Sequence, residues 1–262
     1  MGRMPFEKEL EVARALAAQA GEVALRYRRD GVRTEIKLDL SPVTAADREC
    51  ERLICRALDE AFPDDGLLGE EGAQKEARSG RRWILDPIDG TVDFVRGIPN
   101  WSVLIALEDR DGVAVGVCHL AEQGEMYYAA RNGGAWANER RVRVSGISDP
   151  RQALLCVNGL NTMLEMPFAS GLLEWMSGFW AVRSFSGCQD AMMVASGRAD
   201  AWVEPYAKEW DLAPLKIILE EAGGVFFNFD GGSSIRGGNC CVSTPALAPH
   251  LRRLVLGAGS RQ

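Results

Sequence analysis

The chain has 262 residues, of which 47% are hydrophobic and 26% charged, and its net charge at pH 7 is −7. This composition excludes a disordered chain, and no apolar run approaches the length that a membrane crossing needs. Lysine and arginine are spread along the sequence instead of forming a basic stripe, so we expect neither a nucleic acid nor a membrane as a partner.

The cysteine and histidine content indicates the cellular compartment and excludes several classes of catalytic site. Seven cysteines form an odd set without a Cys-x-x-Cys pair, and the first residues, Met1–Lys8, contain no apolar signal core. These features predict reduced thiols in a cytoplasmic protein. The only histidines, His119 and His250, are far apart in the sequence. We therefore expect no zinc site and no Ser-His or Cys-His triad, which leaves the chemistry to carboxylates.

The first half of the chain opens with two predicted helices. Apolar residues recur at helical spacing from Leu10 to Tyr27, and a second helix is predicted from Thr44 to Ala61, before Pro63. Four strands are predicted after it, at residues 83–86, 102–108, 113–119 and 125–130. The turn signal at residues 109–112 predicts a hairpin between two of them.

The second half alternates strand-like and helix-like segments, which implies layers of helices and mixed sheets. These segments lie at residues 154–157, 172–176, 181–185, 190–195, 201–204, 212–222, 224–227, 240–243 and 247–256. We expect one compact domain over residues 1–262. Within it, the loop at residues 146–150 is the expected join between a metal- and phosphate-binding half (1–145) and a substrate-side half (151–262).

The most informative segment is Trp83–Thr91, in which an apolar run delivers two carboxylates to a turn containing proline and glycine. A buried carboxylate such as that of Asp86 is costly unless it is paired or binds a metal, and no adjacent Lys or Arg is an obvious partner. Asp86 and Asp89 repel each other, and a divalent cation removes that repulsion. The backbone N–H groups after Gly90 are free to bind a phosphate.

Three other acids stand at element boundaries, and each has a structural alternative. Asp47 fits a capping box that begins at Thr44. Asp211, just before an apolar-periodic helix, fits an N-cap. Glu70, beside Gly69 and Glu71, is consistent with a solvated loop.

Three segments together resemble the signatures of the inositol monophosphatase family. They are Gly69-Glu70-Glu71, Trp83–Thr91, and Trp210-Asp211-Leu212-Ala213 with Glu220–Gly224, and the resemblance extends from the first helix to about Asn239. It implies an α+β fold, a layered αβαβα sandwich of the inositol monophosphatase and fructose-1,6-bisphosphatase type. It also implies a Mg²⁺-dependent phosphomonoesterase that acts on a small-molecule phosphate ester as a homodimer.

The resemblance further implies a site with two to three Mg²⁺ ions. Glu70, Asp86 and the carbonyl of Ile88 match one metal site; Asp86, Asp89 and Asp211 match a second; Glu70 also helps to hold a weaker third ion. Oxygen ligands of this kind suit magnesium.

Catalytic and phosphate-binding residues follow from the same resemblance. Asp47 and Thr91 match the pair that orients and activates the attacking water, with the Thr91 hydroxyl as the partner of Asp47, and Glu70 completes the catalytic set. Gly90 and Thr91 match the phosphate cradle. Glu204 falls where the family contacts the polar groups of the substrate.

Substrate contacts are expected from Asp89, Asp93, Ser186, Gly187 and Glu204. Asp93 stands where inositol enzymes usually carry Asn, and its extra negative charge favours a cationic substrate if it faces the pocket; the alternative is that it stabilises the first turn of a helix. Glu204 suits either inositol hydroxyls or the ammonium group of histidinol.

Local features resemble the histidinol-phosphatase branch of the family. They are residues 39–44, Glu204-Pro205, and Trp210–Ala213 followed by Pro214-Leu215. We therefore favour L-histidinol phosphate as substrate, with inositol 1-phosphate as the first alternative and fructose 1,6-bisphosphate or phosphoadenosine phosphate after it.

Two competing interpretations remain. In haloacid dehalogenase phosphatases the nucleophile and the acid are one residue apart, whereas Pro87 and Ile88 both separate Asp86 from Asp89. The second interpretation is a metal-binding relative that has lost catalytic activity. The presence of all the expected acidic residues argues against it.

Overall fold

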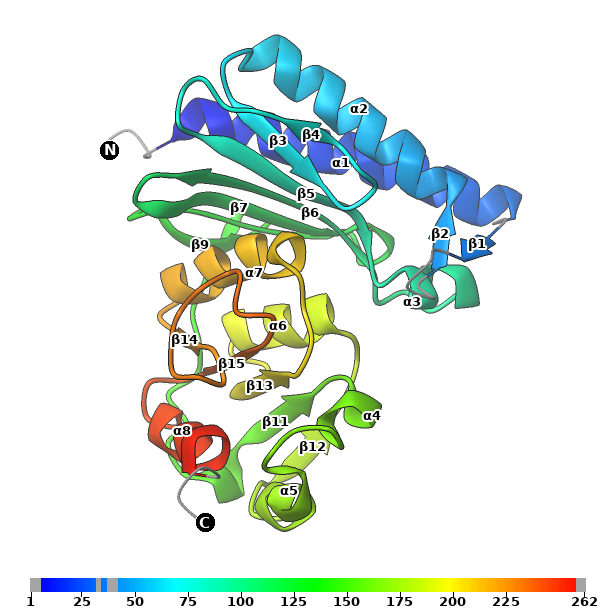
Figure 1. The fold of residues 1–262 in the computed structure, drawn as a ribbon. Helices are drawn as coiled ribbons and strands as arrows, with labels where there is room; N and C mark the ends of the chain where they lie inside the picture. The colour runs from blue at the N-terminus through cyan, green and yellow to red at the C-terminus, as the bar shows by residue number, and fades with distance from the viewer. Residues whose placement is uncertain (1–5, 32–33, 37–41, 258–262) are drawn as a thin grey trace.

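The computed structural model describes residues 6–31, 34–36 and 42–257. Residues 1–5 and 39–41 lie outside this part. The expectation of no signal core rests partly on the first segment, and the resemblance to the histidinol-phosphatase branch rests partly on the second. The elements form layers in the order helix, sheet, helix, sheet, helix (Figure 1). This arrangement confirms the predicted αβαβα sandwich. Within the described residues, no helix has both the length and the apolar character needed to cross a membrane.

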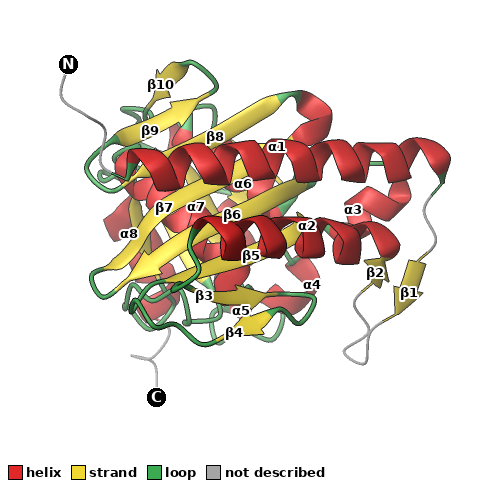
Figure 2. Ribbon diagram, turned by 90° about the horizontal axis from the view of Figure 1, so that it is seen from above, coloured by secondary structure: helices red, strands yellow, loops and turns green. Residues whose placement is uncertain are grey.

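The first layer consists of α1 (Glu7–Asp30) and α2 (Ala45–Ala61), which lie side by side on one face of the first sheet (Figure 2). Small buried residues of α1, such as Ala13, Ala17 and Ala20, allow close packing against its neighbours. Both helices are those predicted from apolar periodicity. A short antiparallel pair, β1 (Thr34–Ile36) and β2 (Pro42–Thr44), stands before α2.

The first sheet has eight strands in the order β10-β9-β8-β7-β6-β5-β3-β4, antiparallel except for the parallel pair β3 and β5. Its strands are β3 (Gly66–Gly69), β4 (Gln74–Lys75), β5 (Arg82–Asp89), β6 (Ser102–Asp109), β7 (Gly112–Leu120), β8 (Glu125–Ala130), β9 (Gly134–Ala137) and β10 (Arg140–Val142). The predicted strands and the hairpin are confirmed. Short α3 (Thr91–Arg96) follows β5, and the 3₁₀ turn η1 (Ala121–Gln123) follows β7.

The middle layer is formed by α6 (Gly187–Ala195) and α7 (Glu209–Glu221), which lie between the two sheets (Figure 1). Helix α7 packs directly on β7 at Gly116. A Cβ atom there would lie 2.6 Å from the carbonyl oxygen of Pro214 and 2.4 Å from the Ile217 side chain, so only glycine allows this approach. The close contact fixes the position of α7 relative to the first sheet.

The second sheet has five strands in the order β12-β11-β13-β15-β14. The strands are β11 (Leu154–Val157), β12 (Ala181–Arg183), β13 (Ala201–Glu204), β14 (Val225–Phe227) and β15 (Cys240–Ser243). Outer helices complete the stack: α4 (Leu160–Met163), α5 (Ala169–Met176) and α8 (Ala248–Gly257). The chain passes between the sheets through residues 143–153, which include the 3₁₀ turn η2 (Pro150–Gln152); the division into two halves at 146–150 stays a prediction.

Candidate active site

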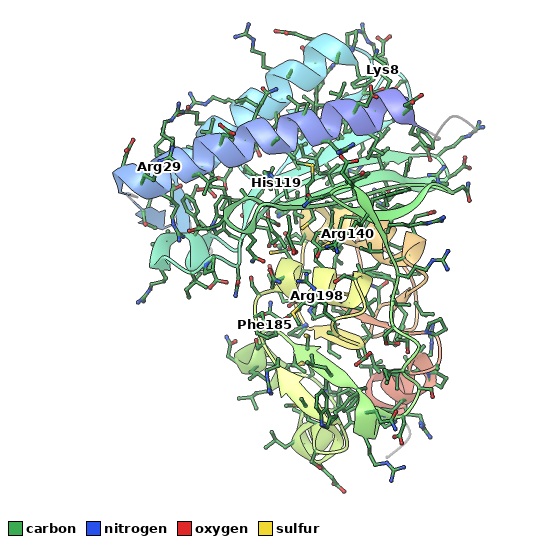
Figure 3. The ribbon with its side chains drawn as sticks, turned by 180° about the vertical axis from the view of Figure 1, so that it is seen from behind. Lys8, Arg29, His119, Arg140, Phe185 and Arg198 are labelled. Atoms are coloured by element: carbon green, nitrogen blue, oxygen red, sulfur yellow. The ribbon has the colours of Figure 1, made fainter. Side chains whose placement is uncertain are left out.

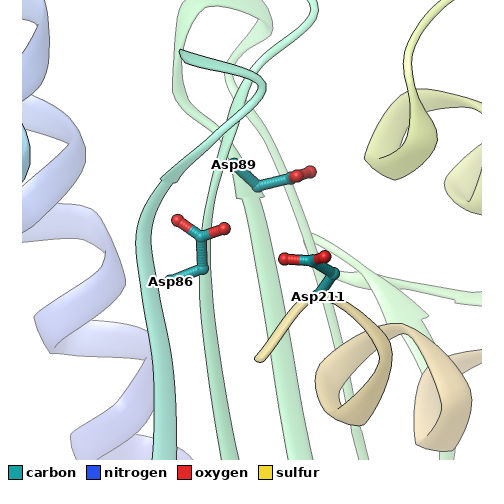
Figure 4. Close-up of side chains that lie close together, drawn as sticks. All are labelled: Asp86, Asp89 and Asp211. Atoms are coloured by element: carbon teal, nitrogen blue, oxygen red, sulfur yellow. The ribbon is translucent and has the colours of Figure 1, made fainter. Parts of the chain in front are cut away.

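Three carboxylates meet where β5 ends and α7 begins. Asp86 and Asp89 come from β5 and Asp211 from the first turn of α7, and one oxygen of each lies within 4.8 Å of the others (Figure 4). We call Asp86, Asp89 and Asp211 the acidic cluster. The ladder between β5 and β6 shifts register between Asp86 and Asp89, where Pro87 has no N–H to donate. The bend therefore brings both aspartates of the turn to the same site.

The hydrogen bonds within the acidic cluster leave oxygen atoms available. Asp86 Oδ1 accepts the Ile88 N–H at 3.0 Å, and Asp211 Oδ2 accepts the Lys208 N–H at 2.7 Å. Asp211 is thus the third residue of α7 in a capping arrangement; the N-cap position that the sequence suggested for it belongs to Lys208. Asp89 Oδ2 is buried and has no hydrogen-bond partner.

Electrostatics make the acidic cluster unfavourable without a cation. Burial raises the pKa of the Asp86 carboxyl well above its ordinary value, and the charges of Glu70, Asp89 and Asp211 raise it further. Burial, above all, also raises the pKa of Asp89 to about 6 and that of Asp211 to about 8. Such raised values mean that the folded protein disfavours the ionised forms. A divalent cation would reverse this preference, so the acidic cluster could hold one.

Glu70 joins the acidic cluster through the parallel pairing of β3 and β5. Gly69 pairs with Leu85, and the Glu70 N–H donates to the Leu85 carbonyl at 3.2 Å, so Glu70 follows β3 beside Asp86. Its charge raises the pKa of Asp86, Asp89 and Asp211. The fold therefore brings the Glu70 backbone beside β5 and Asp211 into the acidic cluster, and the role of Glu70 as a metal ligand stays a prediction.

The loop that carries Glu70 is held by Glu51, a buried residue of α2 that sequence reasoning missed. Glu51 accepts the N–H groups of Glu71 at 2.8 Å and of Ala73 at 3.0 Å. A Cβ atom at position 69 would lie 2.1 Å from Glu51 Oε2, so Gly69 is needed for this contact. The sequence offered no signal for Glu51, because the loop that it holds follows in a different element.

Asp47 fills its predicted capping role at the start of α2, and its role in activating water stays a prediction. Its Oδ2 accepts the Thr44 N–H at 2.8 Å and the Thr44 hydroxyl at 2.5 Å, which completes the capping box of α2. Its Oδ1 is buried without a partner, and burial raises the pKa of this carboxyl. The hydroxyl bound to Asp47 is therefore that of Thr44, at the helix start. The expected partner, Thr91, instead donates to the Ile88 carbonyl oxygen at 3.1 Å.

The predicted phosphate-binding turn opens onto a pocket of about 630 Å³. Gly90 has φ of 83°, a left-handed conformation that suits glycine, and a Cβ there would lie 3.1 Å from the Asn100 carbonyl oxygen. Glu70, Thr91, Asp93 and Ser186 also line this pocket. Asp93 therefore faces the pocket.

A smaller cavity of about 130 Å³ joins the acidic cluster to the second half of the chain. Asp89, Asp211, Gly187 and Glu204 line it. Glu204 is buried, and Asn158, which sequence reasoning missed, donates to its Oε2 at 2.8 Å. Burial, with the charges of Asp89 and Asp211, raises the pKa of Glu204 to about 8.

The loop before α6 is fixed from both sides by residues that the sequence did not indicate. The Phe185 carbonyl accepts the Asn100 side-chain amide at 2.7 Å, and the Phe185 N–H donates to Asp190 at 3.1 Å. Ser186, the next residue, has φ of 134°, which is unusual for a residue other than glycine. The two bonds hold this strained residue at the pocket wall.

Comparison with known proteins agrees with this geometry. The sequence profile of the inositol monophosphatase family matches residues 6–258. A histidinol-phosphatase of Chlorobaculum parvum is 39% identical over 236 residues, which cover 90% of this chain and 91% of that protein. An inositol-1-monophosphatase of Mesorhizobium japonicum is 34% identical over 230 residues, which cover 86% of this chain and 84% of that protein.

Comparison with solved structures identifies the same fold. The extragenic suppressor protein suhB of Bartonella henselae superposes with a TM-score of 0.87 at 29% identity, over 95% of this chain and 98% of that one. The profile match and the relatives each extend over most of the sequence. The chain therefore belongs to the inositol monophosphatase family and is a metal-dependent phosphatase.

Proposed function

We propose that the protein is a Mg²⁺-dependent phosphomonoesterase that hydrolyses the phosphate ester of a small amino alcohol or polyol by attack of a water molecule. The observation that carries the proposal is the acidic cluster, which opens toward the phosphate-binding turn at Gly90 and Thr91. Its oxygens suit a hard divalent cation.

The site residues fit the magnesium ions that the family uses. The donors are all oxygens, and Asp89 Oδ2 is buried without a partner. We assign two to three ions to Glu70, Asp86, the Ile88 carbonyl, Asp89 and Asp211. When bound, such ions lower the pKa of water and offset negative charge on a phosphate.

The chain's own residues supply the proton transfer and the orientation. Asp47 Oδ1, buried and unpartnered, would accept the proton of the attacking water. The backbone N–H groups at Gly90 and Thr91 would bind the phosphate oxygens, and the Thr91 hydroxyl would orient the water. Glu204, Asp93, Ser186 and Gly187 would contact the remainder of the substrate.

The substrate that we favour is L-histidinol phosphate. The pocket carries the extra negative charge of Asp93, which suits a cationic alcohol, and the histidinol-phosphatase relative supports this choice. Inositol 1-phosphate is the second candidate substrate, because of the environment of Glu204. The raised pKa of Glu204 favours a neutral carboxyl, and a neutral carboxyl hydrogen-bonds a hydroxyl more readily than it pairs with an ammonium group.

Measuring phosphate release from a panel of esters in the presence of Mg²⁺ tests both the phosphatase activity and the substrate assignment. We expect the highest kcat/KM for L-histidinol phosphate, compared with myo-inositol 1-phosphate, fructose 1,6-bisphosphate and phosphoadenosine phosphate. A preference for another ester would overturn the substrate assignment alone. No release from any ester would support the inactive relative, and a phospho-aspartate trapped at Asp86 would support the haloacid dehalogenase class.

We also propose a cytoplasmic homodimer. All seven cysteines are free, which suits a reducing compartment. Leu160, Leu164, Leu173 and Trp180 expose large apolar side chains within one stretch of the second half, and a second copy would cover such surface. Sedimentation velocity measures the mass directly; a monomer at micromolar concentration would contradict the dimer.

A further inference from the structure

A second pocket, of about 380 Å³, lies apart from the acidic cluster. Its walls come from β8, the β10 segment and the loop after α6. Arg140, Arg141, Arg143 and Arg198 line it, and Figure 3 labels two of them, Arg140 and Arg198. We call this site the arginine pocket. Three of these arginines are neighbours in the sequence, whereas Arg198, after α6, reaches the pocket through tertiary packing.

The Arg198 side chain is held in place by its neighbours. Its Nη2 donates to the Tyr127 hydroxyl at 2.6 Å and to Glu125 Oε2 at 3.1 Å, and its Nε donates to Ser196 Oγ at 3.0 Å. These bonds fix the guanidinium group at the pocket wall. Because Glu125 balances the charge of Arg198, this pair adds no net charge to the pocket.

The remaining three arginines leave the pocket strongly positive. Throughout residues 6–31, 34–36 and 42–257, no carboxylate forms a salt bridge with Arg140, Arg141 or Arg143. Some exposed arginines, such as Arg48 and Arg151, pair with a carboxylate, whereas among the described residues Arg183 and Arg253 also form no such pair. The guanidinium groups that line this pocket supply positive charge and N–H donors, both of which a bound anion would use.

We propose that the arginine pocket binds a small organic anion with at least two negative charges, of the phosphate or carboxylate class. Guanidinium groups offer paired N–H donors that match two oxygens of one phosphate or carboxylate. The volume of the pocket admits a metabolite-sized ligand. This site is separate from the phosphate-binding turn, so it does not depend on the proposed substrate.

Isothermal titration of the full chain with pyrophosphate tests the proposal. The protein is first freed of divalent metal, because the metal-free acidic cluster repels anions and the measured binding then reports on the arginine pocket. The test variant is Arg140→Gln/Arg143→Gln. The matched control is Arg29→Gln, since Arg29 is an exposed arginine at the far end of α1 (Figure 3).

We expect wild type and Arg29→Gln to bind pyrophosphate alike, and the double variant to bind it at least about tenfold more weakly. Tricarballylate in place of pyrophosphate tests the carboxylate class and should show the same order. Equal affinity in all three proteins, or no wild-type binding of either anion at millimolar concentration, would overturn the proposal. Tighter binding of a short oligoribonucleotide, lost in the same variant, would replace the small anion by a nucleic-acid backbone.

Discussion

The acidic cluster and the arginine pocket lie at opposite ends of α6; carboxylates make up the first, and arginines outnumber the single carboxylate, Glu125, in the second. They differ in burial. Asp86 is 2% exposed and Asp89 and Asp211 are half-buried, whereas Arg140, Arg141 and Arg143 are exposed. Water screens the arginines, so their repulsion costs little, while the buried carboxylates interact strongly and shift one another's pKa. Burial therefore decides which of the two clusters makes the folded protein depend on a counter-ion.

Removal of one buried carboxylate should have the largest effect. Asp86→Asn keeps the shape of the side chain but removes a charge that the metal ions need, so we expect kcat/KM to fall by roughly a thousandfold or more. The metal-free variant should melt at the wild-type temperature or above it, because the change relieves repulsion. Exposed Asp64→Asn is the control, and turnover of Asp86→Asn within tenfold of wild type would contradict the assignment.

Substitution of Glu51, which holds the loop carrying Glu70, should have the next largest effect on activity. Glu51→Gln replaces a carboxylate that accepts two N–H groups of the Glu70 loop, so Glu70 should be held less firmly. We expect the Mg²⁺ concentration for half-maximal activity to rise by roughly 10–100-fold. Glu49→Gln, on the same helix but paired with Arg26 at the surface, should leave this value unchanged. An unchanged Mg²⁺ requirement in Glu51→Gln would refute the supporting role.

Burial should also make the stability of the metal-free protein depend on pH. Asp211 and Glu204 have folded pKa values of about 8, above the ordinary range of carboxyl groups, so their stabilising contribution is lost as pH rises toward 8. Each group then costs up to about 1.4 kcal/mol per pH unit.

Calorimetry between pH 6.5 and 8 measures this loss. The lowered pKa values of His119 and His250 act below that range, and the raised values of the buried thiols act above it. We expect the metal-free Tm to fall across the range and the fall to shrink with saturating Mg²⁺. A metal-free Tm that stays level or rises would count against a buried, uncompensated acidic cluster.

The arginine pocket should give the smallest effect. Arg140→Gln/Arg143→Gln removes two exposed charges, and such surface changes alter stability by about 0.5 kcal/mol or less. Its Tm without added anions and its kcat/KM should match wild type. A loss of several degrees would mean that these arginines serve the fold, and the contrast between the two clusters would disappear.

The sequence alone determined the local parts of this structure. Apolar periodicity fixed α1 and α2, and the apolar run before Asp86 predicted the strand and turn that carry two members of the acidic cluster. The capping pattern at Thr44 was equally local. Short β4 and β10, with polar residues and few apolar ones, gave no comparable signal.

Only the tertiary structure decided which distant residues share a site. Glu51 supports the Glu70 loop, Asn158 binds Glu204, and Arg198 completes the arginine pocket, because sheets and helices from separate parts of the chain pack against each other. Hydrogen bonds and charge pairs of this kind depend on distances in space, which local spacing in a sequence does not encode.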